Sequence, residues 1–200
     1  MTMRFVFLID HISTWVGKTF AWAILILTLV VSYEVFMRYV MGAPTTWAYD
    51  TSYMLYGTLF MMSGAYALAH NAHVRADVVS RYFPLRVQAG LELLLYLLFF
   101  YPGIFALLFY GWDFFAISFR QNEHSSYTPG GPPIWPYKFV IPACAALLAL
   151  QGLAEVLRCV MCLRQGYWPR RLGDVEEIAI PINKEAEIKA AQEQSGEPRQ

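Results

Sequence analysis

Four long apolar stretches occupy most of the chain, at about 20–40, 49–69, 89–111 and 139–162. A bilayer core about 30 Å thick needs about 20 apolar residues in a helix that rises about 1.5 Å per residue. Only helices and closed barrels satisfy every backbone hydrogen bond in lipid. The pattern therefore predicts an all-α membrane protein with four transmembrane helices.

Both ends of the chain differ from these stretches. Before residue 20, apolar and polar positions alternate at helical spacing, which predicts an interfacial N-terminal helical extension. After Trp168 the sequence turns polar. We expect one transmembrane domain over 1–168 and a short cytoplasmic tail, partly disordered, over 169–200.

Basic residues predict the orientation, because Lys and Arg in short connections are retained in the cytoplasm. They gather before the first span, between the second and third, and at or after the end of the fourth: Arg4, Lys18, Arg75, Arg81, Arg86, Arg158, Arg164, Arg170 and Arg171. The two opposite loops hold mainly Arg38, Arg120 and Lys138. Both termini are expected to face the cytoplasm (N-in, C-in), with 41–47 and 113–137 in the periplasm of a bacterium.

The composition supports a membrane protein and excludes one class of partner. Hydrophobic residues make up 57% of the chain and charged residues 15%, which is too apolar for an ordinary soluble domain. Lys and Arg together number 15, as do Asp and Glu. No positive surplus is left to neutralise phosphates, so we expect no nucleic-acid partner.

Glu34 and Arg38 are charged residues inside the first span. Their i,i+4 spacing puts them on one helix face, where they can pair. An unpaired charge at mid-helix costs about 2.5–3.5 kcal/mol on insertion scales. Three interpretations stay open: a clamp that holds the span to its neighbours or to the segment 47–50, a proton or cation site at Glu34, or a contact with a partner.

Small residues and one proline mark possible helix contacts. Gly57 and Gly64 lie in the second span, and Ala145, Ala149 and Gly152 lie in the fourth. Such residues permit close helix packing, either within the chain or against a partner subunit.

Pro102-Gly103 predicts a bend in the third span.

Patterns typical of enzymes, cofactors and metals are absent from the sequence. His73 and Asp77 have no third and fourth ligand at a suitable spacing, and Cys159 and Cys162 have no second cysteine pair. We find no phosphate-binding glycine loop or nucleophile elbow. The sequence predicts no catalytic, cofactor or metal site, and no ionisable cluster in the middle of the membrane.

Several segments in order resemble the small permease (DctQ-like) subunit of tripartite ATP-independent periplasmic (TRAP) transporters. They are the Glu34–Tyr39 motif EVFMRY, Trp47 with Asp50, the Gly64–Leu68 motif GAYAL, the His73–Asp77 motif HVRAD, the Pro132–Pro136 motif PPIWP, and a fourth span that begins near Pro142. The family often has consecutive acids after the tryptophan, whereas this chain has Asp50 alone.

The resemblance implies an accessory, multi-pass subunit of the bacterial inner membrane. Such a subunit scaffolds a large (DctM-like) permease subunit and helps dock a periplasmic (DctP-like) solute-binding protein, for ion-gradient-driven symport of organic acids or related solutes. Lipid is the other expected partner. The structural or partner-interface positions are expected to be Glu34, Arg38, Trp47, Asp50, Gly57, Gly64, His73, Arg75, Asp77, Pro133 and Trp135.

Two other functions remain as alternatives. One is a stand-alone four-helix exporter that couples to protons through Glu34, which would need that carboxylate free and near the bilayer centre. The other is a quinone-linked, thiol-oxidising enzyme, which would need its cysteine pair in the periplasm. The predicted orientation puts Cys159 and Cys162 on the cytoplasmic side.

Overall fold

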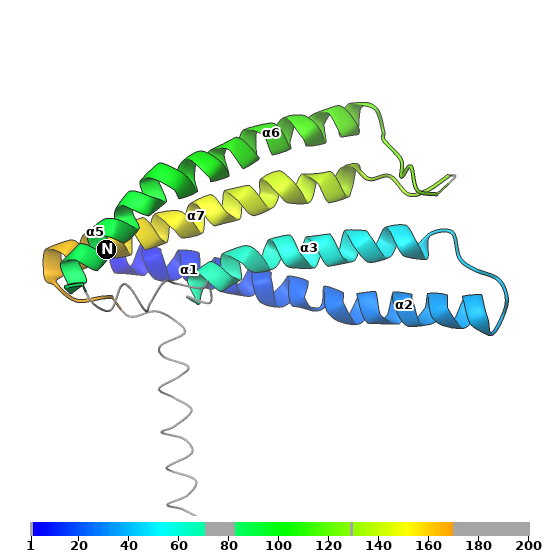
Figure 1. Ribbon diagram of the computed structural model, residues 1–200, viewed down its shortest axis with the longest axis horizontal. Coiled ribbons are helices and arrows are strands. Elements are labelled where there is room, and N and C mark those ends of the chain that lie inside the picture. The colour runs from blue at the N-terminus through cyan, green and yellow to red at the C-terminus, as the bar shows by residue number, and fades with distance from the viewer. Residues whose placement is uncertain (1, 71–82, 129, 170–200) are drawn as a thin grey trace, which may run out of the picture.

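The computed structural model describes residues 2–70, 83–128 and 130–169 (Figure 1). Within these ranges the regular structure is helical, apart from one isolated β-bridge between His124 and Pro133. The elements are α1 (Thr2–Ala21), α2 (Ala23–Tyr39), α3 (Ala48–Ala69), α5 (Leu85–Leu95), the π-helix η1 (Tyr96–Phe100), α6 (Tyr101–Arg120) and α7 (Trp135–Gln165). The predicted all-α class is confirmed.

These elements form four rods that lie side by side in a row. The first rod is α1 followed by α2, interrupted at Trp22, and the third in chain order joins α5, η1 and α6. Along the row the order is α2, α3, α7, α6, with α1 also packed against α3 and α7 (Figure 1). We call the end with the connections 40–47 and 121–134 the loop end. The opposite end, where α1 begins and α7 finishes, is the terminal end.

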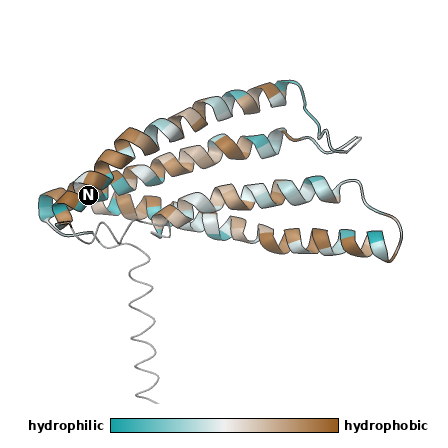
Figure 2. Ribbon diagram, viewed as in Figure 1, coloured by the Kyte–Doolittle hydropathy of each residue, from teal (hydrophilic) through white to brown (hydrophobic). Residues whose placement is uncertain are grey.

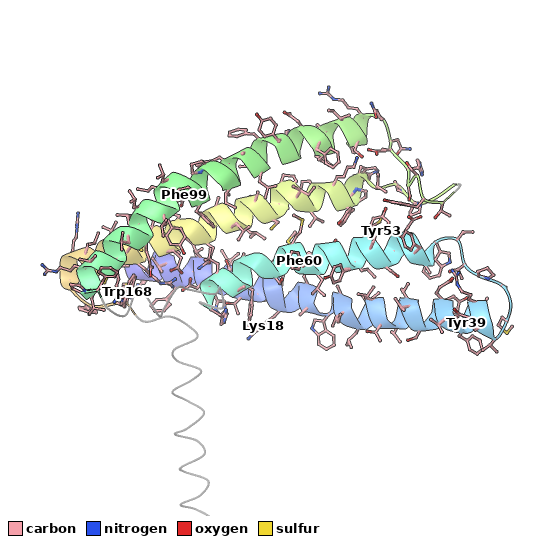
Figure 3. The ribbon with its side chains drawn as sticks, in the orientation of Figure 1. Lys18, Tyr39, Tyr53, Phe60, Phe99 and Trp168 are labelled. Carbon is pink, nitrogen blue, oxygen red and sulfur yellow. The ribbon has the colours of Figure 1, made fainter. Side chains whose placement is uncertain are left out.

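The row leaves most of its apolar surface uncovered. Ala23 is the only residue of α2 that is buried, and η1 buries none. Even in the central helix α3, Phe60 is 70% exposed (Figure 3). Hydrophobic residues recur along the length of the outer helices (Figure 2). Surfaces of this extent require lipid or another protein.

Three helical segments of the described chain are long and apolar enough to cross a membrane: Met3–Tyr39, Leu85–Arg120 and Trp135–Gln165. They support a membrane protein. The helix α3, which contains many Tyr, Ser and Thr residues, is not among them. The predicted count of four spans and the predicted orientation therefore remain predictions.

The proline in the third rod coincides with a change of helix type. Pro102 has no backbone N–H to donate to Leu98. Just before it, η1 adopts π-helical geometry, in which the Tyr101 N–H bonds to the Tyr96 carbonyl. The rod is bowed in Figure 1. The bend predicted at Pro102-Gly103 is thus accompanied by a π-helix that ends two residues before Pro102.

Glycines permit the closest approaches between rods. A Cβ atom at Gly17 would lie 2.4 Å from Cβ of Tyr66, and one at Gly152 would lie 2.4 Å from the Phe100 ring. Gly57 faces the Tyr137 ring in the same way, since a Cβ atom there would overlap the Tyr137 hydroxyl. These glycines pack within the chain, which is one of the two roles considered for the small residues.

The N-terminal segment is helical, as predicted, and it is part of the bundle. Val6 and Ile9 of α1 form a buried cluster with Ala154 of α7. Leu157 and Met161 pack around this cluster. One face of α1 is therefore held against α7 rather than lying free of the other helices.

Candidate functional site

Glu34 connects the last turns of α2 to the connection that follows. One carboxylate oxygen, Oε1, accepts hydrogen bonds from Nε and Nη2 of Arg38 at 3.0 and 2.6 Å. The other, Oε2, accepts from the backbone N–H of Thr45 at 3.0 Å and from its hydroxyl. The Glu34 side chain is 15% exposed and that of Arg38 is 54% exposed. The pair expected from the i,i+4 spacing is present, and Thr45 is its third member.

Trp47 and Asp50 begin α3 beside this group. Trp47 stacks on Tyr33 of α2, with ring centroids 6.1 Å apart. Asp50 is fully buried, and its Oδ1 accepts a hydrogen bond from the Ser125 hydroxyl at 2.6 Å. Among the described residues its Oδ2 has no hydrogen-bond partner. Asp50 thus joins the start of α3 to the connection between α6 and α7.

That connection is folded back on itself. The Ser125 N–H donates to the Pro132 carbonyl at 3.0 Å, and the Ile134 N–H donates to that of Glu123 at 2.9 Å. Nδ1 of His124 donates to the Gly131 carbonyl at 2.7 Å. A Cβ atom at Gly131 would lie about 3 Å from Ser125, Thr128 and Asp50, so this position has no room for a side chain.

The connection is also tied to the first turn of α7. Lys138 forms an ion pair with Glu123, and its ammonium lies 3.9 Å from the centroid of the Phe114 ring. The hydrogen bond from Lys138 holds the pKa of Glu123 below its ordinary value. Trp135 packs edge-to-face on Phe119 at 5.2 Å.

A second polar cluster lies at the terminal end, between α1 and α7. Arg158 forms ion pairs with Asp10 and with Glu155. Nε2 of Gln151 donates to Oδ1 of Asp10 at 2.9 Å, and the Ser13 hydroxyl donates to Oε1 of Gln151 at 2.7 Å. All five side chains are at most 1% exposed. We call these five residues the buried network.

Sequence analysis missed the buried network. Arg158 served there only as a marker of the cytoplasmic side, and the expectation that no ionisable cluster is present concerned the middle of the membrane. A usable signal existed, because Gln151, Glu155 and Arg158 are spaced i,i+4,i+7 and share one face of an otherwise apolar helix. Their partner Asp10 lies 148 residues from Arg158, and no local pattern links the two.

The structure gathers most of the expected site residues at the loop end: Glu34, Arg38, Trp47, Asp50, Pro133 and Trp135. Gly57 and Gly64 lie further along α3, where a Cβ atom at Gly64 would make only an ordinary van der Waals contact with Leu148. His73, Arg75 and Asp77 lie outside the described residues.

Metal-binding groups are not assembled in the part of the chain that the structure describes. No three His, Cys, Asp or Glu side chains are placed there to hold an ion. The cysteines Cys144, Cys159 and Cys162 are free thiols, and all three are buried. Hydrogen bonds and ion pairs join helices and connections at the loop end and in the buried network.

Comparison with known protein families gives a match over more than half of the chain. No curated protein matches the chain. A family model described as "Tripartite ATP-independent periplasmic transporters, DctQ component" matches residues 27–162. This range extends from one turn into α2 through most of α7, and it includes the loop-end residues and three members of the buried network. The chain belongs to the family of DctQ components of tripartite ATP-independent periplasmic transporters.

Proposed function

We propose that this chain is the small membrane subunit that scaffolds the large permease subunit of its transporter and helps dock the periplasmic solute-binding protein. The family is one of transporter components and not of enzymes. Uptake of organic acids or related solutes, driven by an ion gradient, would take place on the large subunit. This chain would sit in the bacterial inner membrane as a multi-pass protein.

The observation that carries the proposal is the open row of rods. A helix bundle that moves cargo alone needs a path enclosed by its own helices. Here α2 packs mainly on α3, and α6 mainly on α7, so each outer rod has one main neighbour. Central residues such as Phe60 remain exposed as well. A single layer of this kind supports a role as a wall against which another subunit packs.

The spacing of ionisable residues supports four spans, including α3. Flanking ionisable groups lie 20 or 21 residues apart on each rod: Lys18 and Arg38, Asp50 and His70, Glu92 and Asp113, Lys138 and Arg158. Twenty helical residues span about 30 Å, which matches the hydrocarbon core. Glu34 and Glu155, the two acids within these intervals, pair with Arg38 and Arg158. With the positive-inside rule, this spacing supports termini in the cytoplasm and a loop end in the periplasm.

The loop end is the surface proposed to meet the binding protein. It combines a folded connection with exposed aromatic side chains, among them Trp47 and Tyr127. Aromatic residues are enriched in the contact surfaces of protein complexes. Because Asp50 and Glu123 hold the connection in place, it can offer a preformed surface rather than a mobile loop.

Copurification tests the proposal. The tagged chain, expressed with the large subunit and the binding protein of the same system, is expected to retain the large subunit in mild detergent. The binding protein is expected to bind the complex of this chain with the large subunit. It is expected to bind the isolated chain only weakly. If the chain and the large subunit elute separately under conditions in which each stays folded, a scaffolding role is excluded.

A further inference from the structure

The outer face of α1 carries two parallel rows of exposed side chains. The first row is apolar and aromatic: Phe5, Leu8, Ile12 and Trp15, continued by Trp22 directly after α1. The second is basic, with Arg4, His11 and Lys18 exposed at intervals of seven residues. Residues seven apart lie almost directly in line on a helix, and residues four apart are neighbours. Each basic residue therefore lies beside one of Leu8, Trp15 and Trp22.

This outer face has a fixed direction, because the inner face is anchored. Asp10 and Ser13 are joined to α7 through the buried network. Gly17 packs on Tyr66 of α3, at a distance that leaves no room for a side chain. The helix α1 cannot turn its outer rows inwards without breaking these contacts. Figure 3 shows Lys18 projecting away from the bundle.

Contacts between the rods indicate that the row is inclined to the membrane. Asp10 contacts Arg158, which is the ionisable residue that flanks the apolar part of α7 at the terminal end. The corresponding flanking residue on the first rod is Lys18. It lies eight residues, or about 12 Å, beyond Asp10 in the direction of the loop end. A flat boundary that passes near both Arg158 and Lys18 crosses the row obliquely.

A second contact gives an offset in the same direction. The Cys144 thiol donates to the Met61 carbonyl at 3.0 Å, so these residues of α7 and α3 are level. Arg158 lies 14 residues beyond Cys144, whereas His70 lies only nine beyond Met61. The five-residue difference is about 7 Å. An inclined helix stays within the headgroup region over more of its length than an upright helix does.

We propose that the outer face of α1 binds anionic phospholipid, with the apolar row among the acyl chains and Arg4 and Lys18 against the phosphates. Charge complementarity selects this occupant, because a neutral acyl surface would not require the two exposed cations Arg4 and Lys18 beside the apolar row. Amphipathic helices with a basic polar side recognise anionic membranes by this combination of contacts. This proposal requires that the chain lies in a membrane, but it does not require the scaffolding role. The lipid-binding proposal and the proposed function can therefore fail independently.

Lipid retention tests the proposal with the full chain alone. The protein is reconstituted in vesicles of phosphatidylcholine and phosphatidylglycerol with matched acyl chains, in a four-to-one mixture, and extracted again in mild detergent. Mass spectrometry then gives the ratio of the two retained lipids, relative to the vesicle. One basic residue near the surface favours anionic lipid by about fivefold. We expect at least fivefold enrichment of phosphatidylglycerol, which decreases as salt is raised.

A double variant and a matched control identify the face. Arg4→Gln with Lys18→Gln keeps the apolar row and removes the charge, and should bring the enrichment below about twofold. Arg120→Gln removes an exposed arginine from the last turn of α6, near the loop end, and should leave the enrichment unchanged. Circular dichroism checks that all variants keep their helices.

Three results would overturn the proposal. The first is that the parent protein retains the two lipids in the same ratio as the vesicle, which would leave neutral lipid or a protein subunit as the occupant of this face. The second is that the double variant retains phosphatidylglycerol with the same enrichment as the parent. The third is an equal loss of enrichment in the Arg120→Gln control, which would indicate a general charge effect.

Discussion

Arg158 is a fully buried guanidinium that lies between two carboxylates from different parts of the chain. A charge in such a position is tolerated only with partners, and removing one partner leaves the other uncompensated. The same logic applies at the loop end, where the Glu34 carboxylate is shared by Arg38 and Thr45. The ionisable groups of the buried network and of the Glu34 site are thus engaged in ion pairs and hydrogen bonds that hold segments of the chain together.

We predict that Asp10→Asn destabilises the bundle by about 3 kcal/mol, because it leaves the buried guanidinium short of one charged partner. The free energy of unfolding in mixed detergent micelles measures the effect. Arg164→Gln, an exposed change in the last turn of α7, should stay within about 0.5 kcal/mol of the parent. A further Arg158→Met change in the Asp10→Asn background should cost much less than in the parent, since the two residues share one interaction. Additive losses would show that they do not.

For Glu34→Ala we predict weaker recovery of the complex with the large subunit, because Arg38 and Thr45 both lose their acceptor and the 40–47 connection is released from α2. The amount of large subunit that copurifies with the tagged chain measures the effect. Ser32→Ala, a neighbouring exposed position on α2, serves as the control. Equal recovery from parent and Glu34→Ala membranes would contradict the prediction.

Close packing at the scale of the helices depends on glycine at particular positions. Gly17 lies where α1 meets α3, and Gly103 lies on the exposed side of α6 with no atom near its missing Cβ. The two positions have the same residue type and opposite surroundings. They therefore separate the effect of packing from the effect of intrinsic helix propensity.

Gly17→Ala is predicted to destabilise the chain by about 1–3 kcal/mol, because the new methyl would overlap Cβ of Tyr66 and the helices would have to move apart. Gly103→Ala should instead be neutral or stabilising by up to about 1 kcal/mol, since alanine favours a helix and nothing obstructs it. Unfolding in mixed micelles compares the two. A neutral or stabilising effect of Gly17→Ala would show that packing at Gly17 is not tight.

Local patterns predicted most of the elements and only part of the contacts. Periodicity and length gave the helical segments, and the i,i+4 spacing gave the Glu34–Arg38 pair. The interaction of Asp10 with Arg158 joins residues far apart in sequence and depends on how the rods are arranged in the row. The hydrogen bond between Asp50 and Ser125 also joins residues far apart in sequence and also depends on how the rods are packed. Neither could be predicted without the packing.

Considered as a whole, the molecule is a single layer of rods with polar connections at one end and both described chain ends at the other (Figure 1). The resemblance to the DctQ family, noted from short motifs, is confirmed by the match over residues 27–162. The number of spans and the orientation depend on where the bilayer lies, and they are best tested by accessibility from each side.

We predict that single cysteines at Gln121 and Gln165 are labelled from opposite sides of the membrane, Gln121→Cys from the periplasm and Gln165→Cys from the cytoplasm. Both positions are exposed, and they lie at the loop end and the terminal end. The native thiols are buried and should react slowly in the parent, which serves as the control. Labelling of both positions from one side would contradict four spans with both termini inside.

The central claim is that this chain supports transport without carrying cargo itself. The most direct measurement is uptake of the system's labelled solute into proteoliposomes under an imposed ion gradient. The account predicts no uptake above empty liposomes with this chain alone, and uptake only when the large subunit and the binding protein are also present. Gradient-driven uptake by the purified chain alone, or full uptake by the other two proteins without it, would contradict the account.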